Sequence, residues 1–173
     1  MIVAPDSPDR LDVQALLAEH LADMFATSPA DAVHALDHAA LAAPGITLLG
    51  AREPDGTLLG CGALAELVAT AAGRPGHGEL KSMRTAAPAR GRGVAAAVLG
   101  RLLGIARERG YGRVSLETGP QDFFAPARRL YARHGFVPCG PFGTYAEDPH
   151  SVFMTLELRV GAVSTSLRGR AGR

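Results

Sequence analysis

The sequence predicts a single α/β domain in which a mixed, mostly antiparallel sheet carries helices on both faces. Three observations favour this class. Seven segments have the apolar pattern of a strand and four have that of a helix, in the order strand, two helices, three strands, helix, strand, helix, two strands. The length of 173 residues suits one domain with a sizeable core. No segment repeats another, and no change in composition marks a second domain.

Turn and capping residues divide the first half of the chain. Apolar side chains such as Leu11 and Leu21 recur at helical spacing up to Phe25. Ser28-Pro29-Ala30-Asp31 combines an N-cap, a proline at the first helical position and an acid in the first turn, so a second helix should start there. Pro54-Asp55-Gly56 is a turn between two strands of a hairpin. The predicted elements are strands at 1–5, 46–51 and 58–68, and helices at 9–25 and from 28 to about 42.

Glycines and prolines mark the boundaries in the second half. Gly73, Pro75, Gly76 and Gly78 predict a loop over residues 69–78. The predicted strands are 79–85, 114–116, a short one beginning at 136 and an alternating one at 151–158; the helices are 94–109 and 123–134, and residues 139–149 form a loop. Residues 160–173 are rich in Gly, Ser and Arg with little apolar content, which predicts a disordered tail after a domain spanning 1–159.

Composition excludes several classes of function. A formal net charge of +1 argues against a nucleic-acid or membrane surface, because such binding usually needs a basic face. No apolar run approaches the roughly 20 residues of a membrane span, and the first residues do not resemble a signal peptide. Cys61 and Cys139 make neither a disulfide framework nor a zinc site, and the histidines show no metal-ligand spacing. We therefore expect a cytoplasmic protein without a bound metal.

The stretch from Ala89 to Ala95, with the sequence ARGRGVA, predicts a tight turn that opens a helix. Gly91 and Gly93 allow the backbone to bend and to approach a ligand closely. The first N–H groups of a helix have no partners within it, and the helix dipole is positive there. Since Arg90 and Arg92 add positive charge, the turn should bind phosphate groups.

Two motifs resemble the signatures of the GNAT (Gcn5-related) N-acetyltransferase superfamily. Residues 90–95, RGRGVA, match its R/Q-x-x-G-x-G/A signature, between the fourth strand and the third helix. Residues 130–136, LYARHGF, resemble its L-Y-x-x-x-G-F signature at the end of the fourth helix. Residues 79–85 and 116–119, with sequences ELKSMRT and LETG, are also similar to a bacterial branch of acetyltransferases. The resemblance covers roughly residues 1–159.

The resemblance implies a site for acetyl-CoA as co-substrate. Backbone amides from Gly91 to Ala96 would surround its pyrophosphate, and the amide of Met83 would polarise the thioester carbonyl. Thr85 would pair with the pantetheine arm as an added strand does. The superfamily often has an asparagine where this chain has Phe124, which could instead pack against that arm or in the core. The expected coenzyme-binding residues are Met83, Arg84, Thr85, Arg90, Gly91, Arg92, Gly93, Val94, Ala95, Ala96 and Phe124.

Two side chains carry the chemistry that the resemblance implies. Glu79 lies eleven residues before Arg90, the spacing of the catalytic glutamate in the histone acetyltransferase branch, and would take the proton of the acceptor amine. Alternation along the strand predicts Glu79, Lys81 and Met83 on one face; a surface Glu79–Lys81 pair is the alternative. Tyr131 would protonate the leaving thiolate, or be a core tyrosine.

The acceptor should be the amine of a small molecule or a peptide. Candidates to bind it are His34, Lys81, Tyr145, His150 and Ser151, with Arg84 nearby. Lys81, the only lysine, and the arginines could recognise a carboxylate on it. The resemblance is also compatible with a homodimer. Two other classes stay open: an acyl-CoA-binding or regulatory module without catalysis, and a nucleotide-binding protein, although the turn lacks the motifs of such sites.

Overall fold

A computed structural model describes residues 1–27 and 38–158 of the chain. It contains one seven-stranded sheet in the order β1-β2-β3-β4-β5-β7-β6. Neighbouring strands are antiparallel except β4 and β5, which are parallel. The elements are β1 (Ile2–Pro5), α1 (Leu11–Thr27), α2 (His38–Leu41), β2 (Ile46–Arg52), β3 (Leu58–Val68), β4 (Gly76–Thr85), α3 (Val94–Glu108), β5 (Tyr111–Thr118), α4 (Ala125–Arg133), β6 (Val137–Cys139) and β7 (Val152–Glu157).

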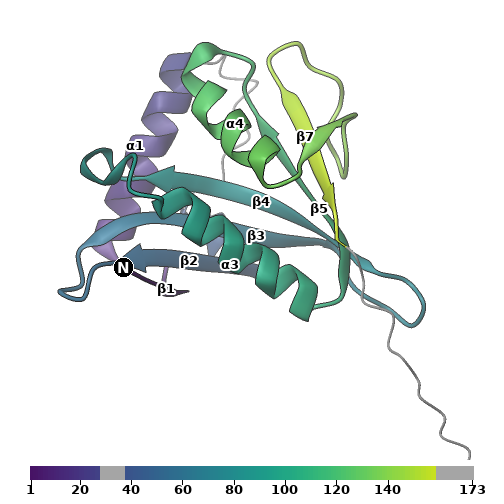
Figure 1. The fold of residues 1–173 in the computed structure, drawn as a ribbon, viewed down its shortest axis with the longest axis horizontal. Coiled ribbons are helices and arrows are strands. Elements are labelled where there is room, and N and C mark those ends of the chain that lie inside the picture. The colour runs from purple at the N-terminus through teal and green to yellow at the C-terminus, as the bar shows by residue number, and fades with distance from the viewer. Residues whose placement is uncertain (28–37, 159–173) are drawn as a thin grey trace, which may run out of the picture.

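Helices cover both faces of the sheet, as expected (Figure 1). The larger core lies between the sheet and α3, around fully buried residues such as Leu99 and Leu102, and extends to Tyr131 of α4. A smaller core on the opposite face joins Val13 and Leu17 of α1 to the sheet. None of the helices in the described ranges is long and apolar enough to cross a membrane. The two cores fix α1 and α4 on opposite sides of β4 and β5.

The second predicted helix falls mostly on residues 28–37, which lie outside the described residues, and α2 forms its end. The predicted tail at 160–173 also lies outside them. The helix expected at 123–134 is instead a 3-10 turn, Asp122–Phe124, followed by α4. Pro126 lies in the first turn of α4, where its missing N–H is tolerated.

The prediction of a loop up to residue 78 is wrong, because β4 already begins at Gly76 and pairs there with Tyr111 of β5. The glycines are needed for packing. A Cβ on Gly76 or Gly78 would lie 2.7–2.8 Å from atoms of the Tyr111 ring, which is 1% exposed. Strand β5 likewise runs beyond the predicted 114–116 into polar residues, because β4 and β7 pair with it on both edges.

The prediction that Met83 shares a face with Glu79 and Lys81 is also wrong. Ser82 has a φ of 54°, in the left-handed region, and the register with β3 shifts at the same place. This bulge reverses the alternation, so that Met83 packs in the α3 core, where a Cβ on Gly62 would meet its sulfur. Lys81 is paired with Ala63, which belongs to the core on the α1 face.

Candidate active site

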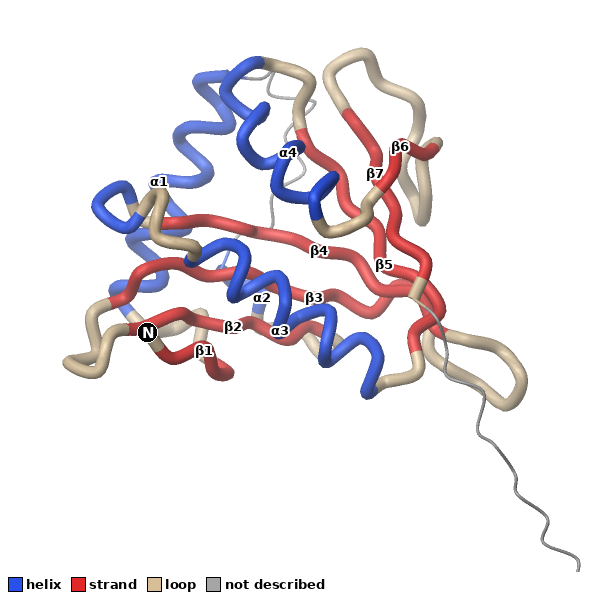
Figure 2. Tube along the Cα trace, in the orientation of Figure 1, coloured by secondary structure: helices blue, strands red, loops and turns tan. Residues whose placement is uncertain are grey.

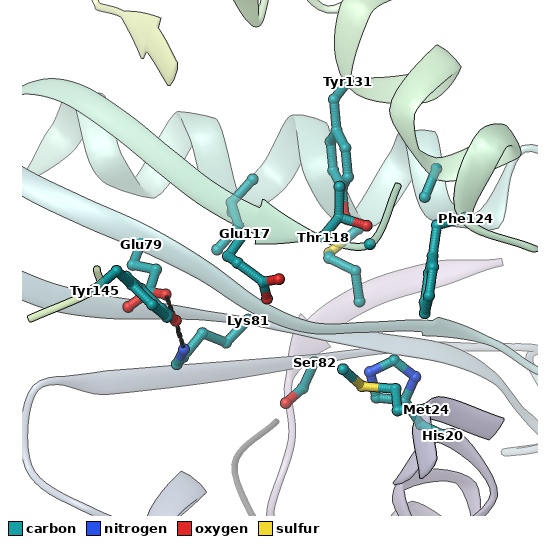
Figure 3. A pocket seen from close by; sticks show the side chains of 14 residues that line it. His20, Met24, Glu79, Lys81, Ser82, Glu117, Thr118, Phe124, Tyr131 and Tyr145 are labelled. Carbon is teal, nitrogen blue, oxygen red and sulfur yellow. Dashed lines mark hydrogen bonds and ion pairs between the residues drawn. The ribbon is translucent and has the colours of Figure 1, made fainter. Parts of the chain in front are cut away.

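A cavity lies where β4 and β5 separate. Their pairing runs from Gly76 to Leu80 of β4, and in the described sheet residues 81–85 have no strand partner on the β5 side. Figure 2 shows the two strands diverging toward α4. Figure 3 shows Tyr131 reaching into the cavity from one side, while His20 and Met24 of α1 lie on the other. A ligand bound between the strands can therefore meet groups from both faces of the sheet.

Glu79 lies at the centre of a buried hydrogen-bonded cluster. Its Oε1 accepts hydrogen bonds from Lys81 Nζ at 2.8 Å and from Tyr145 Oη at 2.6 Å. Lys81 Nζ also donates to Tyr145 Oη at 2.8 Å. The side chains of Glu79 and Lys81 are 6% and 14% exposed, so the alternative of a surface pair is wrong. The sequence thus selected three residues that the structure brings together.

Tyr145 reaches this cluster from the loop after β6, and aromatic packing holds the loop in place. Its ring centroid lies 5.1 Å from that of Phe142 and 5.4 Å from that of Phe153. Burial and the hydrogen bond to Glu79 raise the pKa of the Tyr145 phenol. The phenol is therefore protonated at neutral pH, as its donation to the carboxylate requires.

Tyr131 lies in the last turn of α4, with its ring centroid 5.7 Å from that of Phe136. It is 6% exposed and lines the cavity. Burial, and to a lesser degree the negative charge of Glu117, raise the pKa of the Tyr131 phenol. The side chain therefore keeps its proton at neutral pH and can donate it to an anion in the cavity.

Glu117 of β5 is a second carboxylate of the cavity, and our sequence analysis assigned it no role. Its Oε1 accepts a hydrogen bond from Ser151 Oγ at 2.9 Å. The charge of Glu117 contributes to the raised pKa of both Tyr131 and Tyr145, so it lies near both phenols. The sequence does contain a feature that could have predicted Glu117 as a site residue. It directly follows the apolar strand 114–116, and strand ends next to a crevice in a β-sheet commonly carry functional groups.

The glycine turn before α3 has the expected geometry of an anion site. Gly91 and Gly93 have φ of 76° and 79°, and apart from their own atoms and those of the adjoining residues, no atom of the described structure lies within 4 Å of where their Cβ atoms would stand. In the described structure no side chain caps the N-terminus of α3, so its first N–H groups keep their donor capacity for a ligand. Arg90 is exposed, whereas Arg92 pairs with Glu53. The turn can therefore accept a phosphate through backbone donors.

Of four other predicted site residues, one lines the cavity, two lie away from it and one is outside the described residues. Phe124 is buried and lines the cavity, whereas His150 is exposed and contributes only its backbone to a turn with Asp148. Arg84 faces α1 and pairs with Asp23 at 2.7 Å. His34 lies outside the described residues.

Within residues 1–27 and 38–158, no cluster of His, Cys, Asp or Glu is suited to hold a metal ion. Cys61 is buried, and Cys139 is partly exposed.

The sequence did not predict the α1 side of the cavity, which His20 and Met24 form. The pattern of a helix shows only which of its faces is apolar, and not which residues of that helix line a cavity.

Comparisons with known proteins show what this chain is similar to. The sequence model of the Acetyltransferase (GNAT) family matches residues 13–136. The chain is 49% identical over 146 residues to YsnE of Bacillus subtilis (strain 168), described as an uncharacterized N-acetyltransferase, covering 84% of this chain and 92% of that one. It is 44% identical to YedL of Escherichia coli (strain K12), described in the same way, over 84% and 87% of the two chains.

Among solved structures, the fold is similar to that of a Klebsiella pneumoniae protein assigned as an acyl-CoA N-acyltransferase. The TM-score is 0.71 at 28% sequence identity, and the match covers 91% of this chain and 97% of the other. The likeness therefore extends over nearly the whole of both chains.

Proposed function

The chain belongs to the GNAT acetyltransferase family, and from this premise we propose that it transfers the acetyl group of acetyl-CoA to the amine of a small molecule or peptide. The amine attacks the thioester directly. The single observation that carries this proposal is the meeting of Glu79 and Tyr131 in one cavity, from opposite faces of the sheet. Acetyl-CoA supplies the activated acyl thioester; the protein holds it, accepts one proton and supplies another.

The coenzyme is held at two places in this proposal. The backbone amides of Gly91 to Ala96 bind its pyrophosphate, with Arg90 and Arg92 adding positive charge, since the helix start has no side-chain cap and the turn leaves open space beside its glycines. The pantetheine arm lies along the edge of β4 at residues 83–85, which in the described sheet has no strand partner. Phe124, buried at the cavity wall, packs against the arm.

Glu79 accepts the proton of the attacking amine, directly or through water. Both of its donors, Lys81 and Tyr145, bind the same oxygen, Oε1. No hydrogen bond within the described part of the chain involves Oε2. The two donors fix the carboxylate in one orientation, and Oε2 receives the proton. The backbone N–H of Met83, beside the bulge at Ser82, polarises the thioester carbonyl.

Tyr131 donates its proton to the departing thiolate. Its raised pKa keeps the phenol protonated until the thiolate forms. Glu117, which accepts a hydrogen bond from Ser151, lies near this phenol and adds negative charge to the cavity, which favours the approach of an ammonium group. Lys81 and Tyr145 form the wall of the acceptor compartment, on the α1 face of the sheet.

A turnover screen tests this function. The purified chain is incubated with acetyl-CoA and a panel of amines, amino acids and peptides, while release of the CoA thiol is followed. We expect acceptor-dependent release with at least one class. Tight CoA binding in calorimetry without thiol release from any acceptor would instead indicate an acyl-CoA-binding module without catalysis.

A further inference from the structure

Ser82 is an unusual residue of the cavity. It is 7% exposed, and its Oγ has no hydrogen-bond partner among the described residues. Within residues 1–27 and 38–158 it is also the only residue other than glycine with a positive φ, at 54°. Both features destabilise the fold, because a buried hydroxyl without a partner loses its hydration and an L-residue is strained in the left-handed region. A glycine would avoid both costs.

The surroundings of Ser82 show what kind of ligand group could supply the missing hydrogen bond of its hydroxyl. Figure 3 shows its side chain between Lys81 and the pair His20 and Met24 of α1. Burial, and secondarily the charge of Arg84, lower the pKa of His20 to about 4, so the imidazole is neutral at pH 7. This part of the cavity therefore offers a hydroxyl, a neutral ring and a thioether, which are polar or polarizable but uncharged.

The charged groups of the cavity do not favour an anionic ligand. Among the described residues that line it, Glu79, Lys81 and Glu117 are charged, which gives a net charge of −1. Lys81 already donates to Glu79 and to Tyr145. The nearby Arg84 is paired with Asp23 at 2.7 Å. Each positively charged side chain at the described cavity is therefore already paired with a carboxylate.

We propose that Ser82 and His20 form a specificity subsite that hydrogen-bonds an uncharged polar group on the body of the acceptor, so that the enzyme selects amines without a carboxylate. This assignment rests on the proposed acetyl transfer. It replaces the expectation that Lys81 recognises a carboxylate. The Ser82 Oγ is fully buried in the unliganded structure, so the side chain turns about its χ1 bond toward the acceptor to gain the missing hydrogen bond. The residue thus contributes to acceptor binding at the expense of the stability of the unliganded protein.

The variant Ser82→Ala tests the residue. We expect kcat/KM for the acceptor to fall about 3- to 10-fold, which corresponds to one lost hydrogen bond to a neutral group. The affinity for CoA should be unchanged, and the Tm unchanged or higher. Ser115→Ala is the matched control, because the buried Ser115 hydroxyl already bonds His77 Nε2 at 2.8 Å and Thr155 Oγ1 at 2.9 Å. Its Tm should fall. A fall in Tm for Ser82→Ala with unchanged acceptor kinetics would overturn the proposal.

The selectivity is tested with pairs of amines that differ only in a carboxylate or a carboxamide, such as phenylalanine and phenylalaninamide. We expect the carboxamides to be acetylated at least about tenfold more efficiently, and Ser82→Ala to reduce that ratio. Preference for the carboxylates would overturn the subsite while acetyl transfer stands. If no amine is acetylated, the proposed function fails, and the subsite is then tested by calorimetric binding of the same amides to the CoA-saturated protein. Weaker binding of the amides by Ser82→Ala than by the wild type supports the subsite, and equal binding overturns it.

Discussion

Tyr131 combines burial with a phenol whose pKa is raised. If it protonates the thiolate, Tyr131→Phe should lower kcat roughly 100-fold and leave CoA affinity unchanged. Because the raised pKa keeps the acid protonated at alkaline pH, the kcat of the wild-type enzyme should show no falling limb up to about pH 9.5, below the ordinary phenol pKa of about 10. A falling limb at pH 8–9 that disappears in Tyr131→Phe would contradict the raised pKa.

Glu79 is the second side chain with a predicted catalytic effect. Glu79→Gln keeps the shape of the side chain but cannot accept the amine proton, so kcat should fall roughly 10²- to 10³-fold. CoA binding, measured by calorimetry, should not change. Glu66→Gln is the matched control, since Glu66 bonds the Tyr111 hydroxyl away from the cavity. Equal turnover by the two variants would remove Glu79 from the mechanism.

Some of these side chains could be predicted from the sequence and others could not. Glu79 and Tyr131 follow from the resemblance to the GNAT superfamily, and Lys81 from its place two residues after Glu79 in the same predicted strand. The contact of Tyr145 with Glu79 joins residues 66 positions apart, and no local pattern encodes it. His20 was missed for the same reason, because its place in the cavity depends on how α1 packs on the sheet.

The turn that opens α3 makes a separate prediction. Gly93 has a φ of 79°, so Gly93→Ala strains the left-handed turn by about 1 kcal/mol. The free turn can relieve this strain by leaving the phosphate-binding conformation, and CoA binding must then restore it, so CoA affinity should fall up to about fivefold. Gly100→Ala is the control in the middle of the same helix, with open space around its Cβ position. It should raise the Tm by about 2–4 °C and leave CoA binding unchanged. Equal CoA affinities would argue against the turn as the anion site.

Strand β4 shows where prediction from sequence fails at the level of elements. The glycines at its start have the composition of a loop, yet they are required because the Tyr111 ring packs against them. Its bulge at Ser82 reverses the direction of Met83, and serine gives no warning of a left-handed conformation. Both errors come from tertiary packing that overrides local preference.

The stability of the whole molecule should depend on pH through two histidines. Burial is the main cause that lowers the pKa of His20 and of His77 to about 4, whereas in the unfolded chain it is about 6.5. Between these values the unfolded state binds more protons, so stability is complete above about pH 6.5 and is lost as the pH falls toward 4. The Tm should rise from pH 4 to 6.5 and then level off. His77→Gln should flatten this rise and the exposed His150→Gln should not; a Tm independent of pH would contradict the lowered pKa values.

The fold as a whole was the most predictable level. The order of apolar segments, with two motifs correctly placed, was sufficient to predict a mixed sheet between helices, and the structure confirms it. The acceptor compartment was the least predictable, because it is assembled from α1, β4, β5 and the loop after β6. Its residues have no common motif and meet only in the folded protein.

A crystal structure of the chain with CoA tests the central claim, that the coenzyme lies between the separated strands. We predict the diphosphate against the backbone amides of residues 91–96 and the sulfur within hydrogen-bonding reach of the Tyr131 hydroxyl. A diphosphate bound away from this turn, or a sulfur remote from Tyr131, would contradict it.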